Sequence, residues 1–544
     1  MTLSLAAGVR SWSRDLPSRA RVAARERVRI DARSLAVFRI LAGFLIVADV
    51  LSRSRNLRYF YTDEGVVPTS LAIASEPAAA YSLYTLVSTP RGTAALFALT
   101  AFVGVALAVG YYTRVATVAA FVLVVSLDLR NPFVLSFADT LFATLLFWAI
   151  FLPLGERWSV DAVADDRPRR SSVANVATAL VLVQMVTMYL VNGLHKTASD
   201  LWWSGEATVL ILGIDEITFL FGDSLRAFSE LLRLGGLVWF GMLLGAWLLL
   251  AFRDRPRHLL VAAFASVHLS LALTTRIGAF SYVCLAGLTL FVMPSAWSDG
   301  RRLLTHVGSH LDAAGVPVRP LAGRVRRGHT RAIAIARRLP RPILRLPFST
   351  PVAPTGRNAL LAAVVLVGIG LATAASLSAL GVVDEETPQA EIETGATAFI
   401  AFQTDWSIFA PNPRTVDRYY VFPALTTEGD VVDVRNDRPM TYDRPYGELQ
   451  RQHDTYRERF YMASLPDDGD GLPVADHLAD HLCTTYRTAD GDRLTHVNMY
   501  RAEERITRET IGDPAGRERT EHLLSRHACT EGDPPRVIAP PENW

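Results

Sequence analysis

Apolar residues in this chain gather in continuous blocks as long as a membrane-spanning helix, rather than recurring at the spacing of a surface helix. A helix needs roughly 17 to 25 mostly apolar residues to cross a bilayer. Charged residues, proline or glycine separate one block from the next. The pattern predicts nine transmembrane helices, near residues 35–52, 93–110, 114–131, 136–153, 173–194, 234–252, 257–275, 278–294 and 358–383.

The chain after the ninth block has the pattern of a water-soluble domain. Apolar and polar residues alternate in 418–422 and in 431–434, and a Glu-Gly-Asp turn between them predicts a β-hairpin. Residues 445–463 and 474–488 have helical patterns, and 493–505 is typical of a strand. We therefore expect a mostly α-helical polytopic membrane protein that carries a carboxyl-terminal α+β or β-sandwich-like domain.

The distribution of charged residues predicts five parts of the chain and the side of the membrane on which each part lies. Arginine concentrates in the short cytoplasmic loops of membrane proteins, which places the amino terminus inside and both the acidic domain and the loop after residue 194 outside. The expected cell-membrane protein therefore has an arginine-rich cytoplasmic arm (1–34), a transmembrane domain of about eight helices (35–294), a basic cytoplasmic linker (295–357), a ninth helix (358–383) and an acidic exterior domain (384–544). We expect the linker, with 12 arginines and two aspartates, to lie on anionic lipid rather than on nucleic acid.

Lys196 is the only lysine among 544 residues, whereas the other 54 basic side chains of the Lys and Arg class are arginines. Arginine in place of lysine, together with 31 acidic against 17 basic residues in 384–544, is typical of a salt-adapted organism with a GC-rich genome. A guanidinium stays protonated, but a desolvated ε-amine can release its proton and act as a base. Lys196 is therefore a candidate catalytic residue, and the alternative is an anchor that snorkels to the membrane surface.

Other polar residues fall in or beside the predicted spans, mostly toward their outer ends. Such residues are costly in hydrocarbon and usually mark a cavity or a partner. We expect an outward-opening pocket in which aspartates balance Lys196 or hold it by hydrogen bonds, and in which Trp202 and Trp203 exclude water. The alternative is a set of scattered interfacial anchors. The supporting pocket residues are Asp49, Asp128, Asp139, His195, Asp200, His268 and Arg276.

Several separated motifs carry a resemblance to a known family. They are Leu35–Asp49, Phe60–Pro68, Arg157–Asp161, Gly193–Lys196 followed by Asp200 and Trp202, and His268–Val283. In this order they resemble the vitamin K-dependent γ-carboxylase-like superfamily, whose members carry the horizontally transferred transmembrane (HTTM) domain. Phe402–Pro413 resembles the segment that opens the soluble part of bacterial and archaeal relatives.

The resemblance implies a membrane enzyme in which Lys196 acts as base toward a reduced quinone, either vitamin K or menaquinone. Trp202 and Trp203 would bind that cofactor, CO₂ and O₂ would be co-substrates, and no metal would take part. The substrate would be a glutamate of a secreted peptide or protein at the outer face. The chain has no histidine near Asp139 and has Leu271 at a position that is polar in the carboxylases, so glutamate carboxylation itself stays open.

Two alternatives come from other functional classes: a non-catalytic factor for peptide maturation or export, of the sporulation-delaying-protein type, and a transporter. Of the three cysteines, Cys284 falls in a predicted span, whereas Cys483 and Cys529 belong to the exterior domain. Disulfides form in such oxidising settings, so we expect Cys483 and Cys529 to be linked. His477 and His481 lie one helical turn apart, but without a third ligand they predict a solvated face rather than a zinc site.

Overall fold

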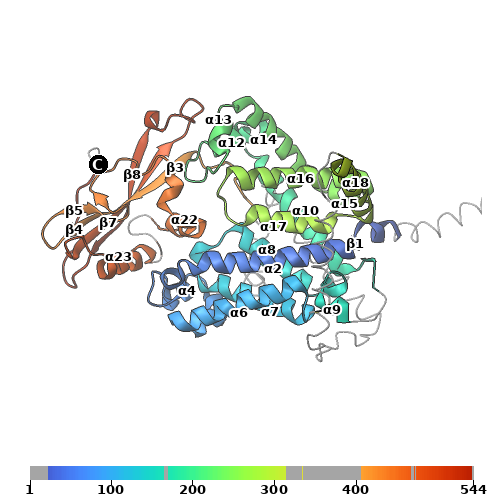
Figure 1. Ribbon diagram of the computed structural model, residues 1–544. Coiled ribbons are helices and arrows are strands. Elements are labelled where there is room, and N and C mark those ends of the chain that lie inside the picture. Colours follow the sequence, from blue (N-terminus) through green and yellow to red (C-terminus); the bar gives the residue numbers. More distant parts are fainter. Residues whose placement is uncertain are drawn as a thin grey trace, which may run out of the picture.

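The computed structural model describes residues 22–164, 169–313, 334, 406–466, 471 and 473–541. A long bundle of helices carries a β-sheet domain at one end, and α18 and β1 lie at the other end (Figure 1). The predicted ninth helix, residues 358–383, lies outside the described residues, as do residues 1–21 of the arm and most of the linker.

The bundle contains helices that coincide with the eight apolar blocks before residue 295. The longer helices are α2 (Ala32–Ser54), α6 (Pro90–Val109), α7 (Thr113–Arg130), α8 (Phe137–Ala149), α10 (Val176–Lys196), α14 (Ser229–Leu244), α16 (Asp254–Thr274), α17 (Phe280–Leu288) and α18 (Pro294–Ala313). The shorter ones are α3 (Leu57–Tyr61), α4 (Thr69–Ser75), α5 (Leu83–Leu86), α9 (Val160–Ala164), α11 (Asp200–Ser204), α12 (Glu206–Leu212), α13 (Gly222–Arg226) and α15 (Leu248–Ala251). The two-stranded sheet β1 (Ile30–Asp31) and β2 (Ser172–Val173) joins the chain segments that precede α2 and α10.

Four described helices, α2, α6, α10 and α16, are long and apolar enough to cross a membrane. The prediction of nine spans is therefore not confirmed. The apolar block at 136–153 yields only the 13-residue α8, and the block at 234–252 breaks between α14 and α15. Arg114, Asp128 and Arg130 interrupt the apolar character of α7. The apolar blocks thus located the helices, and a fifth span is reached among the described residues if the bent pair Phe280–Phe291 and Pro294–His310 counts as one.

Close packing of α2 on α6 depends on two small residues. A Cβ atom added to Gly43 would lie 2.4 Å from the carbonyl oxygen of Gly104, so only glycine fits there. Small residues allow helix backbones to approach in this way inside membranes. Gly110, with φ of 70°, ends α6 in the left-handed region that glycine tolerates.

The carboxyl-terminal domain, called the exterior domain below because we expect it to lie outside the membrane, is built on the long strand β7 (Leu494–Arg505). This strand pairs antiparallel with β3 (Val416–Val421), β4 (Pro423–Thr426) and β8 (Arg519–Ala528). Strand β5 (Val431–Asp433) pairs with β4, and β6 (Arg438–Pro439) pairs with β5. Helices α22 (Tyr456–Ala463) and α23 (Val474–Thr485) complete the domain. Cys483 and Cys529 form a disulfide, with their Cα atoms 5.4 Å apart, which ties α23 to the end of β8.

The predicted hairpin is wrong in one of its strands. Its first strand is β4, which pairs with β5 around the Glu-Gly-Asp turn, whereas 418–421 belongs to β3 and pairs with β7. Alternation cannot tell these partners apart, because both strands have one buried face. The predicted helix at 445–463 is shorter as well, since a 3₁₀ turn, Leu449–Gln452, occupies the middle of that range before α22 begins.

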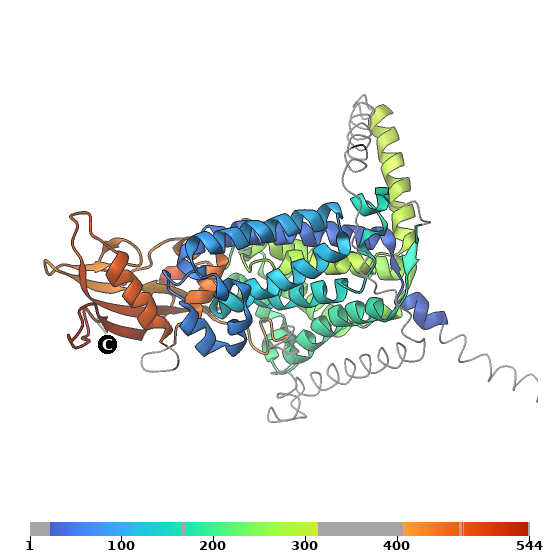
Figure 2. The same cartoon turned by 90° about the horizontal axis from the view of Figure 1, so that it is seen from below.

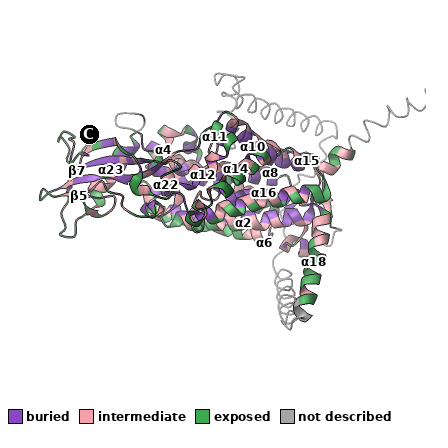
Figure 3. Cartoon of the chain, turned by 90° about the horizontal axis from the view of Figure 1, so that it is seen from above, coloured by how far each residue is buried: buried purple, intermediate pink, exposed green. Residues whose placement is uncertain are grey.

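Helix α18 lies across the end of the bundle rather than along it. It follows the apolar pair Phe280–Leu288 and Thr289–Phe291 after a bend of 102° (Figure 2). Much of its surface is exposed, including Leu303 and Leu304 beside Arg301 and Arg302 (Figure 3). Mixed apolar and basic exposure is typical of a helix that lies in the plane of a lipid surface.

We expect the two ends of the bundle to face opposite sides of the membrane, because the exterior domain and α18 lie at opposite ends (Figure 1). A reporter fused after residue 295 should behave as cytoplasmic, and one fused after residue 384 should behave as exterior. Paired alkaline-phosphatase and fluorescent-protein fusions measure this, since each is active on one side only. An exterior signal at 295 would contradict the orientation inferred from the arginine distribution.

Candidate active site

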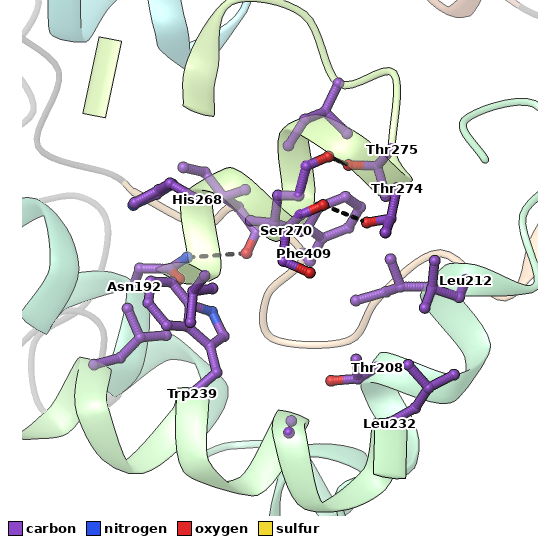
Figure 4. A pocket seen from close by; sticks show the side chains of 18 of the residues that line it. Asn192, Thr208, Leu212, Leu232, Trp239, His268, Ser270, Thr274, Thr275 and Phe409 are labelled. Atoms are coloured by element: carbon purple, nitrogen blue, oxygen red, sulfur yellow. Dashed lines mark hydrogen bonds between the residues drawn. The ribbon is translucent and has the colours of Figure 1, made fainter. Parts of the chain in front are cut away.

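A cavity of about 370 Å³ lies at the end of the bundle nearest the exterior domain, between α10, α12, α14 and α16. Figure 4 shows Leu212, Leu232, Trp239 and Phe409 around it. Most of its wall is apolar, including Leu271. Its polar lining comes from Lys196, Asn192, Tyr189, His268 and a few serine and threonine hydroxyls.

Lys196 is the last residue of α10, and its side chain borders this cavity while being only 1% exposed. Its ammonium nitrogen Nζ donates a hydrogen bond to the carbonyl oxygen of Ile408, at 2.5 Å, and lies 4.3 Å from the centre of the Trp202 ring. Among the described residues no carboxylate forms an ion pair with Lys196. The positive form of this amine therefore has a carbonyl and an aromatic face as partners, but no counter-charge.

The segment Trp406–Phe409, which opens the exterior domain, closes the cavity next to Lys196. Asn192, one helical turn before Lys196, donates to the carbonyl oxygens of Trp406 and Ile408, at 2.6 and 2.9 Å. The indole nitrogen of Trp202 donates to the carbonyl of Phe409, at 3.1 Å. Sequence reasoning missed Asn192 and Ile408 as site residues. The spacing of four residues between Asn192 and Lys196, which puts both on one helix face, was the available signal.

His268 lies in the same cavity as Lys196, as the sequence suggested. It is buried on α16, and its Nε2 atom is 2.8 Å from the Tyr189 hydroxyl, so these two groups share a hydrogen bond. The other ring nitrogen, Nδ1, has no hydrogen-bond partner among the residues that the structure describes. An imidazole with one bonded and one unbonded nitrogen can exchange a proton with a ligand.

The three aspartates lie in a different place, and the expectation that they balance Lys196 is wrong. Arg53 pairs with Asp49 at 2.8 Å, with Asp128 at 2.5 Å and with Asp139 at 3.1 Å. Arg457, from α22 of the exterior domain, pairs with Asp49 at 2.6 Å and with Asp139 at 2.7 Å. The planar guanidinium fork suits several carboxylates at once, which the single ammonium of lysine does not. These five residues form a buried charge cluster that joins the bundle to the exterior domain.

The remaining predicted residues do not line the Lys196 cavity. Arg276 reaches the exterior domain, where it donates to the backbone carbonyls of Gln450 at 3.2 Å and Asp454 at 2.9 Å. Asp200 is exposed at the start of α11, and Trp203 is 57% exposed. His195 is half-buried beside Lys196 in the sequence but is absent from the cavity wall. Of the two predicted cofactor-binding tryptophans, only Trp202 therefore borders the cavity.

A second group of charges fixes the exterior domain to the loop after α12. Arg517 pairs with Asp417 at 3.0 Å and with Asp215 at 3.3 Å, and Arg444 bridges Asp215 and Glu504. Burial raises the pKa of Glu504, while Arg444 lowers it. Together with the Arg457 contacts, this group joins the exterior domain, which begins with segment 406–409, to the bundle.

Comparison with known proteins gives one match. A model of the HTTM domain family matches residues 28–297, which include every helix that contributes to the Lys196 cavity. Neither a curated protein nor a solved structure matches the chain. Residues 28–297 thus match the HTTM domain, which is consistent with the HTTM, γ-carboxylase-like superfamily.

Proposed function

We propose that this protein is a membrane enzyme of the carboxylase type, in which Lys196 acts as base toward a reduced quinone and the substrate is a peptide or protein glutamate at the outer face. The observation that carries the proposal is the environment of Lys196. Its amine is buried at the wall of an apolar cavity and pairs with no carboxylate among the described residues. A neutral amine is favoured where the charged form is desolvated and unpaired.

The cavity suits a quinone in size and in lining. Ligand pockets span roughly 300 to 1,000 Å³ and are mostly apolar, with a few polar groups that orient the ligand. The cavity of about 370 Å³ has this character, because Leu212, Leu232 and Trp239 form an apolar wall and Lys196 and His268 provide the polar groups. When bound, a reduced vitamin K or menaquinone would supply with O₂ the strong base that glutamate carboxylation by CO₂ requires.

The residues of the chain itself would position and move one proton. The free electron pair of Lys196 Nζ would accept the proton of a ligand hydroxyl, while one of its N–H bonds stays donated to the Ile408 carbonyl. The face of Trp202 would stabilise the ammonium that results. His268 would hold a second polar group of the ligand through Nδ1, since Nε2 is already bonded to Tyr189.

Reductive methylation tests this directly, because Lys196 is the only lysine and formaldehyde is small enough to enter the cavity. The amino terminus is the other primary amine that the reagent modifies. We expect a short-chain menaquinol to slow the methylation of Lys196 at least about tenfold, which mass spectrometry of the full chain in nanodiscs would measure. The amino terminus serves as the internal reference. Equal rates with and without the menaquinol would refute the proposal and favour a non-catalytic maturation factor.

Two glycines of α14 offer a matched pair of variants for this test. Gly235 lines the cavity and a Cβ there meets no atom within 4 Å, so Gly235→Leu should obstruct the cavity without a backbone clash. Gly241 has equally open surroundings but does not line the cavity. Protection by menaquinol should therefore be lost in Gly235→Leu and kept in Gly241→Leu.

A further inference from the structure

A second, smaller chamber of about 270 Å³ lies between the bundle and the exterior domain. Ile277, Phe280, Ile408 and Phe409 line both this chamber and the Lys196 cavity, so the two share a wall. Ile408, whose carbonyl accepts the hydrogen bond from Lys196, belongs to that wall. A ligand in the second chamber would therefore be separated from Lys196 by the wall that contains Ile408.

Two arginines of the exterior domain, Arg414 and Arg459, border the second chamber. Arg414 forms an ion pair with the buried Glu216. Arg459, on α22, lies against the ring of Phe460, with the guanidinium carbon 4.8 Å from the ring centre. Within the described part of the chain no oxygen accepts a hydrogen bond from its guanidinium. Arg459 thus differs from Arg457 on the same helix, which has two carboxylate partners.

The chamber has more positive than negative charge. Glu216 is the carboxylate that acts on Arg459, but it is already paired with Arg414. Burial lowers the pKa of Arg459, and Arg414 lowers it further, whereas Glu216 opposes them. Glu216 and Asp417 both act on Arg414. Arg459, in contrast, has no carboxylate hydrogen-bonded to it among the described residues, so an anionic ligand would supply its missing partner. Arginine forms two parallel hydrogen bonds with a carboxylate, so an anion of this shape would satisfy Arg459 best.

We propose that Arg459 binds a carboxylate of the substrate in this second chamber, beside Arg414 and across the Ile408–Phe409 wall from Lys196. The inference rests on the proposed function for the identity of the substrate, but the carboxylate site follows from the unpaired guanidinium. A chamber of about 270 Å³ admits one side chain rather than a folded partner. Arg459 would accordingly select acidic side chains over their amides.

Binding of two blocked amino acids to the full chain in nanodiscs tests this. The probes are N-acetyl-L-glutamate N-methylamide and its glutamine counterpart, detected by saturation-transfer NMR. A charge-assisted hydrogen bond contributes about 1.5 to 3 kcal/mol, which corresponds to roughly 10- to 100-fold in affinity. We expect the glutamate probe to bind more tightly than the glutamine probe by at least the lower of these factors.

Variants assign the effect to Arg459. Arg459→Gln should lower the affinity for the glutamate probe by the same factor, so that the two probes bind equally well. Arg459→Lys should retain part of the preference for the glutamate probe. Arg451→Gln is the control, because Arg451 lies eight residues earlier and its side chain is 66% exposed. The unfolding midpoint of each variant checks that it folds, and Arg459→Lys keeps the test valid if Arg459→Gln is unstable.

The outcomes separate this inference from the proposed function. Unchanged glutamate binding in folded Arg459→Gln, or equal binding of both probes to the unmodified chain, would overturn the carboxylate site even if menaquinol still protects Lys196. Glutamate binding that depends on Arg459, without any protection of Lys196 by menaquinol, would support the carboxylate site and refute the quinone enzyme.

Discussion

Replacing Lys196 by arginine is expected to lower the activity by about 10² to 10⁴-fold, the usual contribution of a general base. Arginine can donate to the Ile408 carbonyl, but its guanidinium does not lose a proton in proteins and so has no free electron pair to accept one. The measurement is menaquinol-dependent oxygen consumption and ¹⁴CO₂ incorporation into a synthetic glutamate-rich peptide, with the full chain in nanodiscs.

The neighbouring tryptophans give a control for that result. Trp203 is largely exposed and lies outside the cavity wall, so Trp203→Phe should retain the activity. Trp202→Phe should reduce it, because the indole N–H that holds the Phe409 carbonyl is lost. Full activity of a folded Lys196→Arg variant would show that the amine is not a base, and Lys196 would then be a structural anchor for segment 406–409.

Replacing Arg457 by methionine is expected to destabilise the folded chain by about 3 to 5 kcal/mol, the cost of breaking a buried ion pair by removing one partner. The arginine is 2% exposed and donates to Asp49 and Asp139 as well as to the carbonyl of Val134. Without it, three carboxylates would share the single guanidinium of Arg53. The shift in the denaturant midpoint of the full chain measures this effect.

A compensating variant distinguishes lost charge balance from lost packing. Adding Asp139→Asn to Arg457→Met should recover part of the stability, since one unpaired buried carboxylate disappears with its charge. Arg451→Met, at an exposed position, should change the midpoint by no more than about 0.5 kcal/mol. A destabilisation by Arg457→Met as small as that of Arg451→Met would contradict the role of the charge cluster in joining the exterior domain to the bundle.

The sequence located the helices and the candidate base, because both are local properties. Apolar blocks mark helices wherever they lie, and Lys196 stands out by composition alone. One partner of the aspartates, Arg457, was beyond its reach, whereas Arg53 lies only four residues after Asp49. Asp49 and Arg457 are 408 residues apart, and nothing in either segment specifies the other. The depth of the aspartates in the predicted spans matches that of Lys196, but depth alone does not specify which cation each carboxylate pairs with.

The same limit applies to the strands and to the walls of the cavity. Local alternation predicted a hairpin around Glu428–Asp430, but the partner of 418–421 is β7, some 80 residues later. Segment 406–409 was recognised by resemblance as the start of the soluble part, yet its carbonyl contacts with Asn192 and Lys196 depend on how two domains dock. Such contacts follow from tertiary structure, which periodicity does not encode.

The hydrogen bond from Lys196 to Ile408 spans 212 residues, and this separation sets an order of events during synthesis. The ribosome completes the helices of residues 28–297 before it reaches segment 406–409. Until then the amine lacks its carbonyl partner and the cavity lacks one wall. The nascent protein is thus expected to stay inert at first, and to complete the proposed reactive centre only when the last quarter of the chain folds.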